Sequence, residues 1–196
     1  DWFSVFYNYS DNSGAPAFGQ RILPDESLAP PTKGVTNDYG FILTLFDEKL
    51  SLRATFYETN QDAAPAVNLE NSATNIIRPN EEILIALQRG NRITDAEYQD
   101  HLLGEEARLV GLADVKTKGF EIEATFNLTR NFTSRISYSH TDVDRSNVMP
   151  EFDDWFATEK AFWLSTAGAG DLVTSRETTV SQEITELDRV SNYVRD

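Results

Sequence analysis

Cysteine is absent from this chain of 196 residues, and long apolar runs are absent as well. Without cysteine there is no disulfide framework, no thiolate metal ligand and no cysteine nucleophile. No stretch approaches the roughly 18–20 consecutive apolar residues of a membrane-spanning helix. That second absence excludes helical spans only, because a barrel strand crosses a membrane with about 9–11 residues, of which every second one is apolar.

Positive charge is also scarce, since 17 lysines and arginines stand against 32 aspartates and glutamates and leave a net charge of −15. Proteins that bind nucleic acid gather Lys and Arg on one surface. We therefore expect no nucleic-acid partner. The two histidines, His101 and His140, lie in different segments, and no third residue beside them indicates a metal site.

Motifs for catalysis and metal binding are weak. The segment 142–146 begins like a calcium loop, but Asn147 stands where such a loop requires glycine and Asp153 where it requires glutamate. It is better interpreted as the acidic entrance of a loop. Glu121 and Glu123 share a strand face, as a catalytic carboxylate pair would, yet alternating charges are expected on any wetted strand. We predict a protein that is not an enzyme, with no catalytic residue, cofactor or metal.

Five segments alternate apolar and polar residues with a period of two, which is the pattern of β-strands that have one apolar face. In the clearest segment, Phe120 and Ile122 alternate with Glu121 and Glu123. The predicted strands cover residues 2–10, 38–46, 49–59, 116–128 and 131–142. The predicted fold class is all-β with helical loop insertions, an antiparallel meander of about five long strands.

The connections between these strands have unequal lengths. Residues 47–49 and 129–131 form turns of hairpin length. The connections over 11–37, 60–114 and 143–196 are long, and the last two carry most of the excess negative charge. Short turns at one end of a sheet and long loops at the other are typical of outer-membrane barrels, whose long loops are extracellular. The pattern favours one segment of a transmembrane β-barrel.

The long connections contain helix signals. Asn80 is a candidate N-cap for a helix over 81–89, with Gly90 in the C′ position. Thr94 and Glu97 have the spacing of a capping box that opens a second short helix. The loops are therefore expected to be structured.

The last connection has helical patterns over 151–164 and 176–194. The first of these is rich in aromatic residues, and Trp155 and Trp163 are candidates for contact with a ligand. Packing of the loops against one another is the alternative interpretation of this aromatic cluster.

The polar strand faces supply the second set of candidate site residues. In a barrel such a face lines a wet lumen, whereas a charge on the lipid face costs about 2–4 kcal/mol near the membrane midplane. The lumen-facing candidates are Arg53, Tyr57, Glu121, Glu123 and Arg135. Aromatic residues near the strand ends fit the interfacial girdles of a barrel. Packing in the core of a β-sandwich is the alternative interpretation of these residues. They are Tyr7, Tyr9, Tyr39, Phe56, Phe132 and Tyr138.

The amino-acid sequences of the predicted strands resemble those of a known family, the TonB-dependent outer-membrane receptors. Residues 3–10 (FSVFYNYS) resemble the "lslFyNyS" strand of these receptors, and 36–51 resemble their next hairpin, "yGi" followed by "lfd-gkls". Residues 56–59 match the "fYet" that ends the rising strand. Residues 117–123 (TKGFEIE) resemble the recurrent "tkGfEiE" strand, and 127–132 the "nlt" turn after it. The order and spacing of these motifs are more specific than any one of them.

The resemblance covers the strands up to about residue 142, and it implies a segment from the middle or late part of a barrel of roughly 22 strands in the outer membrane of a Gram-negative bacterium. Such receptors bind a scarce nutrient, of the siderophore, cobalamin or glycan class, and import it with energy delivered through TonB. The implied partners are membrane lipids, the nutrient ligand, and the plug domain and TonB through parts of the protein outside these residues. Both chain ends are expected to be cut from something larger, so that residues 1–196 form a partial β-barrel domain.

Two other interpretations stay open. A soluble or surface all-β module for ligand binding or adhesion would bury the apolar strand faces in a closed core. A passive porin would have similar strands but would lack the receptor-like sequence motifs. Because five strands cannot close a large barrel, we also expect a curved sheet with an exposed edge that aggregates without lipid or detergent.

Overall fold

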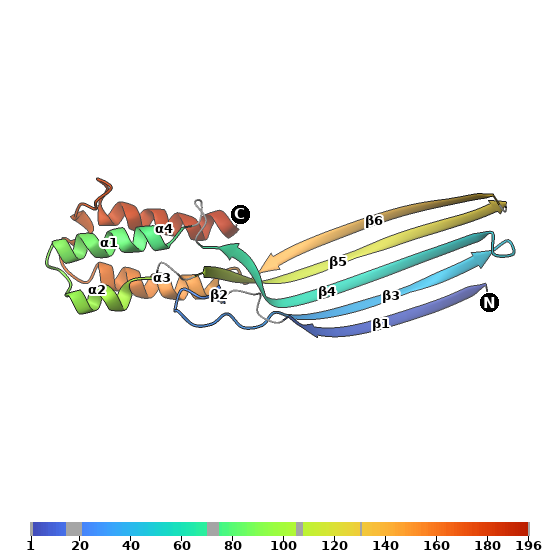
Figure 1. Ribbon diagram of the computed structural model, residues 1–196, viewed down its shortest axis with the longest axis horizontal. Helices are drawn as coiled ribbons and strands as arrows, with labels where there is room; N and C mark the ends of the chain where they lie inside the picture. Colours follow the sequence, from blue (N-terminus) through green and yellow to red (C-terminus); the bar gives the residue numbers. More distant parts are fainter. Residues whose placement is uncertain (1, 15–20, 70–74, 105–107, 130, 196) are drawn as a thin grey trace. The chain divides into compact units, whose positions relative to one another are not determined.

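The computed structural model describes residues 2–14, 21–69, 75–104, 108–129 and 131–195. The chain forms two compact units, whose elements are labelled in Figure 1. The sheet unit comprises Asp1–Ala15, Pro31–Ala64 and Asp114–Ser146. The helical unit comprises Pro16–Pro30, Pro65–Ala113 and Asn147–Asp196.

The sheet unit is an antiparallel meander. Its strands are β1 (Phe3–Ser13), β3 (Lys33–Leu45), β4 (Leu50–Asn68), β5 (Arg108–Thr129) and β6 (Phe132–Ser146), of which β4 and β5 also enter the helical unit. Neighbours along the chain are neighbours in the sheet, in the order β1-β3-β4-β5-β6 (Figure 1). The predicted five-strand meander is thereby confirmed. Among the described residues, β1 and β6 each pair with one strand only, so the sheet is not closed.

The strands extend beyond the ranges that alternation predicts. Ser13 still pairs with Lys33, and Lys33 also pairs with Asp62, so parts of the predicted loops 11–37 and 60–114 belong to the sheet. Both faces are polar at this end, so the period of two fades in the sequence while the backbone pairing continues. One link there joins the Thr36 and Thr59 hydroxyls, 2.9 Å apart.

The β3–β4 turn has an unusual backbone. Phe46, Asp47 and Glu48 have φ angles of 57°, 52° and 67°. In this left-handed region the Cβ atom approaches the following carbonyl oxygen, at a cost of roughly 1–2 kcal/mol per residue. The turn closes by a 3.2 Å hydrogen bond from the Lys49 amide to the Phe46 carbonyl.

The helical unit has its own hydrophobic core. Its helices are α1 (Ile77–Arg89), α2 (Asp95–His101), α3 (Pro150–Trp163) and α4 (Val180–Arg195), with a 3-10 turn at Ala169–Asp171 and the short strand β2 (Arg21–Ile22) parallel to β5. The helices contribute fully buried apolar side chains, including Ile83, Leu84, Phe152, Trp163 and Leu187. The expectation of helical, structured loops is met by these elements.

The start of α1 corrects one prediction. Asn80 is not an N-cap, because the helix begins at Ile77 and places Asn80 inside it, fully buried. Its side-chain amide donates to the His101 carbonyl at 3.2 Å and its oxygen accepts from the Leu103 amide at 3.2 Å. The side chain thus stabilises the chain after α2 instead of the first turn of α1.

Of the two other predictions for helix ends, the one for the end of α1 is wrong and the one for the start of α2 is confirmed. Gly90 is the C-cap of α1 with a φ of −77°, not a left-handed C′ residue, and Asn91 adopts the positive φ instead. The capping box before α2 is confirmed: the Glu97 amide donates to the Thr94 hydroxyl oxygen at 3.2 Å, and the Thr94 amide donates to the Glu97 carboxylate at 2.7 Å.

Candidate functional site

The sheet unit has one strongly apolar face. Strand alternation and register place large apolar side chains of all five strands on this face, and many of them are exposed, including Val5 at 71%, Tyr7 at 66% and Ile136 at 61%. Contiguous exposed apolar surface marks contact with another apolar phase. This face has the chemistry of a surface that contacts lipid.

A row of aromatic rings crosses this apolar face. Tyr7 pairs with Tyr39 and Tyr39 with Phe56, and the row continues through Phe120 to Tyr138 by ring-centroid distances of 6.1 and 5.9 Å. Beyond the row the face becomes charged: Glu58, two residues past Phe56, and Lys116, four residues from Phe120, form an ion pair of 2.8 Å. Phe132, also predicted for a girdle, lies at the opposite end beside the β5–β6 turn. The row therefore marks an apolar-to-polar boundary.

The opposite face of the sheet is polar and carries all five lumen-facing candidates. Arg53 pairs with Ile42, Glu121 with Ser139 and Arg135 with Thr125, so alternation places Arg53, Tyr57, Glu121, Glu123 and Arg135 on the same face. Arg135 donates to the Glu123 carboxylate in an ion pair. The structure gathers these side chains on one surface, and it brings Glu123 and Arg135 into contact.

Two glycines on this polar face lie beneath aromatic rings. A Cβ at Gly119 would lie 2.6 Å from the Tyr57 hydroxyl oxygen, and one at Gly40 would lie 2.7 Å from the Phe6 ring. The Tyr57 hydroxyl reaches Thr141 at 2.5 Å across β5. The Arg53 guanidinium lies 4.9 Å from the Phe6 ring centroid, within reach of a cation–π interaction. The missing side chains let the rings lie flat across the neighbouring strand.

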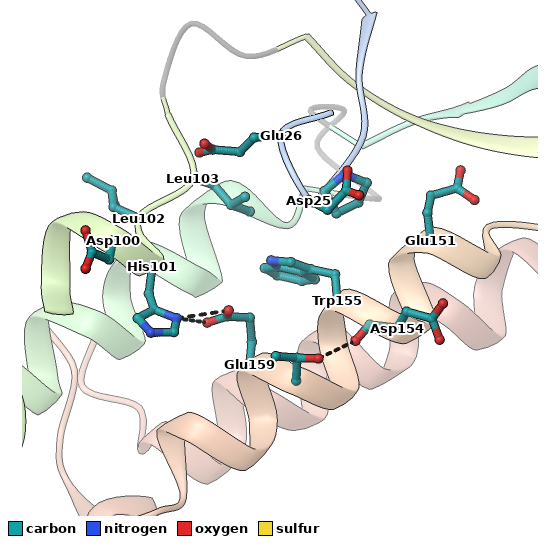
Figure 2. Close-up of a pocket in the computed structure, with 12 residues that line it drawn as sticks. Asp25, Glu26, Asp100, His101, Leu102, Leu103, Glu151, Asp154, Trp155 and Glu159 are labelled. Carbon is teal, nitrogen blue, oxygen red and sulfur yellow. Dashed lines mark hydrogen bonds and ion pairs between the residues drawn. The ribbon is translucent and has the colours of Figure 1, made fainter. Parts of the chain in front are cut away.

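The helical unit contains a cavity of about 440 Å³ (Figure 2). Its lining includes six carboxylates, those of Asp25, Glu26, Asp100, Glu151, Asp154 and Glu159. Leu102, Leu103 and Trp155 provide apolar wall, and no lysine or arginine is among the described residues that line it. The cavity thus combines an apolar wall with strong negative charge.

The two tryptophan candidates have different surroundings. Trp155 exposes 8% of its surface and lines the cavity. Trp163 is fully buried, with its ring centroid 6.0 Å from that of Trp155, and its Nε1 has no hydrogen-bond partner within the described chain. A side chain buried in this way contacts core residues, so only Trp155 is positioned to meet a ligand in this conformation.

His101 connects α2 to α3 at one side of the cavity. Its Nδ1 lies 3.0 Å from both carboxylate oxygens of Glu159 (Figure 2). Its ring stacks on that of Phe162, with the ring centroids 3.7 Å apart. Burial raises the pKa of Glu159, and the hydrogen bond from His101 opposes part of that rise. Glu151 lies in the first turn of α3 and accepts a hydrogen bond from the Leu112 amide at 2.6 Å. Burial raises the pKa of Glu151 as well.

Within the described ranges, no three His, Cys, Asp or Glu side chains are arranged to hold a metal ion. No helix in the part of the chain that the structure describes is long and apolar enough to cross a membrane.

The sequence does not reveal the cavity. Its parts come from segments far apart, since His101 and Glu159 are separated by 58 positions, and neither residue belongs to a motif. One signal was present: both residues stand beside aromatic or apolar positions of predicted helices, where a charged side chain needs a partner when it is buried.

Comparison with solved structures finds membrane receptors. The ferripyoverdine receptor of Pseudomonas aeruginosa bound to ferripyoverdine matches with 16% identity and a TM-score of 0.47, over 74% of this chain and 16% of that chain. The FpvAI–pyocin S2 complex matches with 16% identity and a TM-score of 0.48, over 74% and 16%. The alcaligin outer-membrane receptor FauA from Bordetella pertussis matches with 15% identity and a TM-score of 0.43, over 74% and 20%. This chain thus spans about a sixth to a fifth of these receptors.

No curated protein matches the chain. The family model of the TonB-dependent receptor-like β-barrel matches residues 1–177, most of its length. Proteins of this family lie in the outer membrane of Gram-negative bacteria and are transporters and receptors, not enzymes. The exposed apolar face, the polar face opposite it and the antiparallel meander agree with that match. The chain belongs to the TonB-dependent receptor β-barrel family.

Proposed function

We propose that the chain is part of the wall and the extracellular loops of a transporter that takes up a scarce nutrient with energy delivered through TonB. The observation that carries the proposal is the two-faced sheet of a chain that belongs to this family: an exposed apolar face, bounded by an aromatic row, opposite a face with Arg53, Glu121, Glu123 and Arg135. A closed soluble core would bury the apolar face, so the soluble binding or adhesion module is disfavoured.

In this proposal each surface has a partner. The apolar face contacts membrane lipids, and the polar face, including Tyr57, lines the lumen against a plug domain that lies outside these residues. The connections over 11–37, 60–114 and 143–196 are extracellular, and their helical parts contribute to the ligand entrance. No nucleic acid is involved, because the net charge of −15 repels a phosphate backbone.

The nutrient belongs to the siderophore, cobalamin or glycan class. The ferric siderophore class is the first to test, because one similar structure is a receptor bound to ferripyoverdine and another is a receptor for alcaligin.

The test uses the full-length parent protein in its host. A deletion strain and its complemented partner are compared for uptake of radiolabelled ferric siderophores, cobalamin and oligosaccharides, each with and without TonB. We expect one class to lose uptake in the deletion strain and in the strain without TonB. Uptake that needs the parent but persists without TonB would identify a passive porin instead. Recovery of the parent in the soluble fraction without detergent would contradict the membrane assignment.

A further inference from the structure

The apolar face of the sheet unit has a second boundary, at its turn end. Phe46 in the β3–β4 turn exposes 72% of its surface, and Phe132 beside the β5–β6 turn exposes 55%. Charged residues follow Phe46 at positions 47–49. The apolar face therefore forms a band between the aromatic row and the turn end, and the length of this band can be counted in residues.

Four strands give the same length for this apolar band. Its ends are six residue steps apart on each of them, at positions 39–45 of β3, 50–56 of β4, 120–126 of β5 and 132–138 of β6. With a rise of about 3.3 Å per residue, the band is about 20 Å long along the strands. Beyond the aromatic row, the next residue on the same face of each strand is polar or charged; these residues are Asn37, Glu58, Lys118 and His140.

This band is short for a membrane wall. Transmembrane barrels have an apolar band about 25 Å tall, on strands tilted by about 35–45°. At that tilt, about 20 Å of strand covers only about 15 Å of the membrane thickness. A span of the usual 9–11 residues, counted from Leu50 or from Phe132, would place Glu58 and His140 in hydrocarbon. Burial of a charged side chain there is unfavourable.

We infer that this wall is matched to a thinned bilayer, so that the lipids in contact with it span less than those around it. Bilayers accommodate a short apolar span by local thinning at a modest cost. Thinning keeps Glu58, Lys118 and His140 among the lipid headgroups while the apolar band stays covered. The inference rests on the proposed function, because it applies only where the apolar face meets lipid.

Depth measurements along the band test the inference. Asp47→Cys, Ile136→Cys and His140→Cys are made singly in a cysteine-free background of the full-length receptor, and each is labelled with a nitroxide. The receptor is reconstituted in dimyristoyl- or dioleoyl-phosphatidylcholine bilayers, which differ in thickness. Electron paramagnetic resonance with oxygen and with a water-soluble nickel chelate measures the depth of each label. We expect the label at Ile136→Cys in hydrocarbon, and the labels at Asp47→Cys and His140→Cys outside it, in both bilayers.

A longer apolar band should move the membrane boundary. Glu58→Leu combined with Lys118→Leu makes the next position on β4 and β5 apolar, and it removes one charge of each sign. In dioleoyl bilayers the label at His140→Cys should then shift toward the hydrocarbon by roughly 5 Å, the height of two residues on a tilted strand. The matched control is Glu123→Leu with Arg135→Leu, which removes an ion pair from the polar face and should leave this depth unchanged.

Heat-dependent migration on gels confirms that each labelled receptor is folded before its depth is measured. A label at Asp47→Cys or His140→Cys that lies in the hydrocarbon of dioleoyl bilayers would overturn the inference. A label at His140→Cys that does not move when the band is lengthened would overturn it as well. In both cases an Ile136→Cys label in hydrocarbon would leave the proposed membrane wall intact. A water-accessible label at Ile136→Cys in both bilayers would instead reject lipid contact, and with it the proposed function of this segment.

Discussion

At the scale of single residues, two carboxylates of the helical unit respond to pH in opposite directions. Burial raises the pKa of Glu151, whereas the backbone amide and the hydroxyl of Thr94 lower the pKa of Glu97. A carboxyl whose pKa is raised by folding stabilises the fold below its unfolded pKa and loses that contribution as pH rises through its folded pKa. A carboxyl whose pKa is lowered stabilises the fold above its unfolded pKa and loses that contribution as pH falls.

The first prediction concerns Glu151→Gln. Glutamine still offers an oxygen to the Leu112 amide but never ionises, so it avoids the cost of a buried charge. The wild type should therefore gain stability relative to this variant as pH falls from about 7 to about 4, through the range in which a glutamate with a raised pKa takes up its proton. Denaturant unfolding of the full chain in detergent micelles, followed by tryptophan fluorescence, measures the difference.

Glu97→Gln is the matched control, because its pH dependence has the opposite sign. The wild type should lose stability relative to Glu97→Gln as pH falls below the ordinary glutamate pKa of about 4.3, because protonation then removes the charge that the Thr94 amide and hydroxyl stabilise. If lowering the pH shifted the stability of the wild type in the same direction relative to both variants, burial would not be raising the pKa of Glu151.

At the scale of elements, α2 depends on its N-terminal capping box. The helix has seven residues and contributes no buried side chain, so few tertiary contacts compensate for a lost cap. Thr94→Ala should lower the free energy of unfolding by about 0.5–2 kcal/mol. It should also increase amide hydrogen exchange in α2 more than in α1, as measured by mass spectrometry.

Thr94→Ser is the control, since serine keeps the hydroxyl that accepts from the Glu97 amide. The variant should exchange like the wild type. Equal exchange in Thr94→Ala and Thr94→Ser would mean that packing, and not the cap, holds α2 in place.

The elements also show how far sequence reasoning reaches. Alternation identified all five long strands because one face is apolar, and the capping box identified the start of α2 because its partners are three residues apart. The strand extensions near Ser13 and Lys33 were missed, since pairing between two polar faces leaves no period in the sequence. Asn80 was misplaced because its hydrogen bonds go to residues 21 and 23 positions away. Contacts of that range depend on tertiary packing.

At the scale of the whole molecule, the aromatic row predicts which strand positions lie in lipid. Leu52 and Asn60 point to the same side of β4, but Leu52 lies on the turn side of Phe56 in that row and Asn60 beyond it. The chain has no cysteine, so each position can carry a single one in this segment. In intact cells, Asn60→Cys of the full-length parent should react with a membrane-impermeant maleimide, and Leu52→Cys should not.

Labelling after detergent solubilisation is the control, and it should modify both positions. Equal labelling of the two cysteines in intact cells would contradict the proposed membrane boundary. Labelling of neither in intact cells, with both labelled after lysis, would contradict the proposed extracellular orientation.

The pairing of Ser13, Lys33 and Asp62 has a further consequence, for immune recognition of the cell that carries this protein. Beyond the aromatic row the paired sheet continues for six residues of β3, from Tyr39 to Lys33, roughly 20 Å along the strand. In the proposed orientation an antibody meets an ordered surface there, built from three strands that are distant in sequence. A linear peptide copied from one of those strands would lack two thirds of that epitope. Antibodies raised against the folded protein should therefore recognise bacteria better than antibodies raised against such peptides.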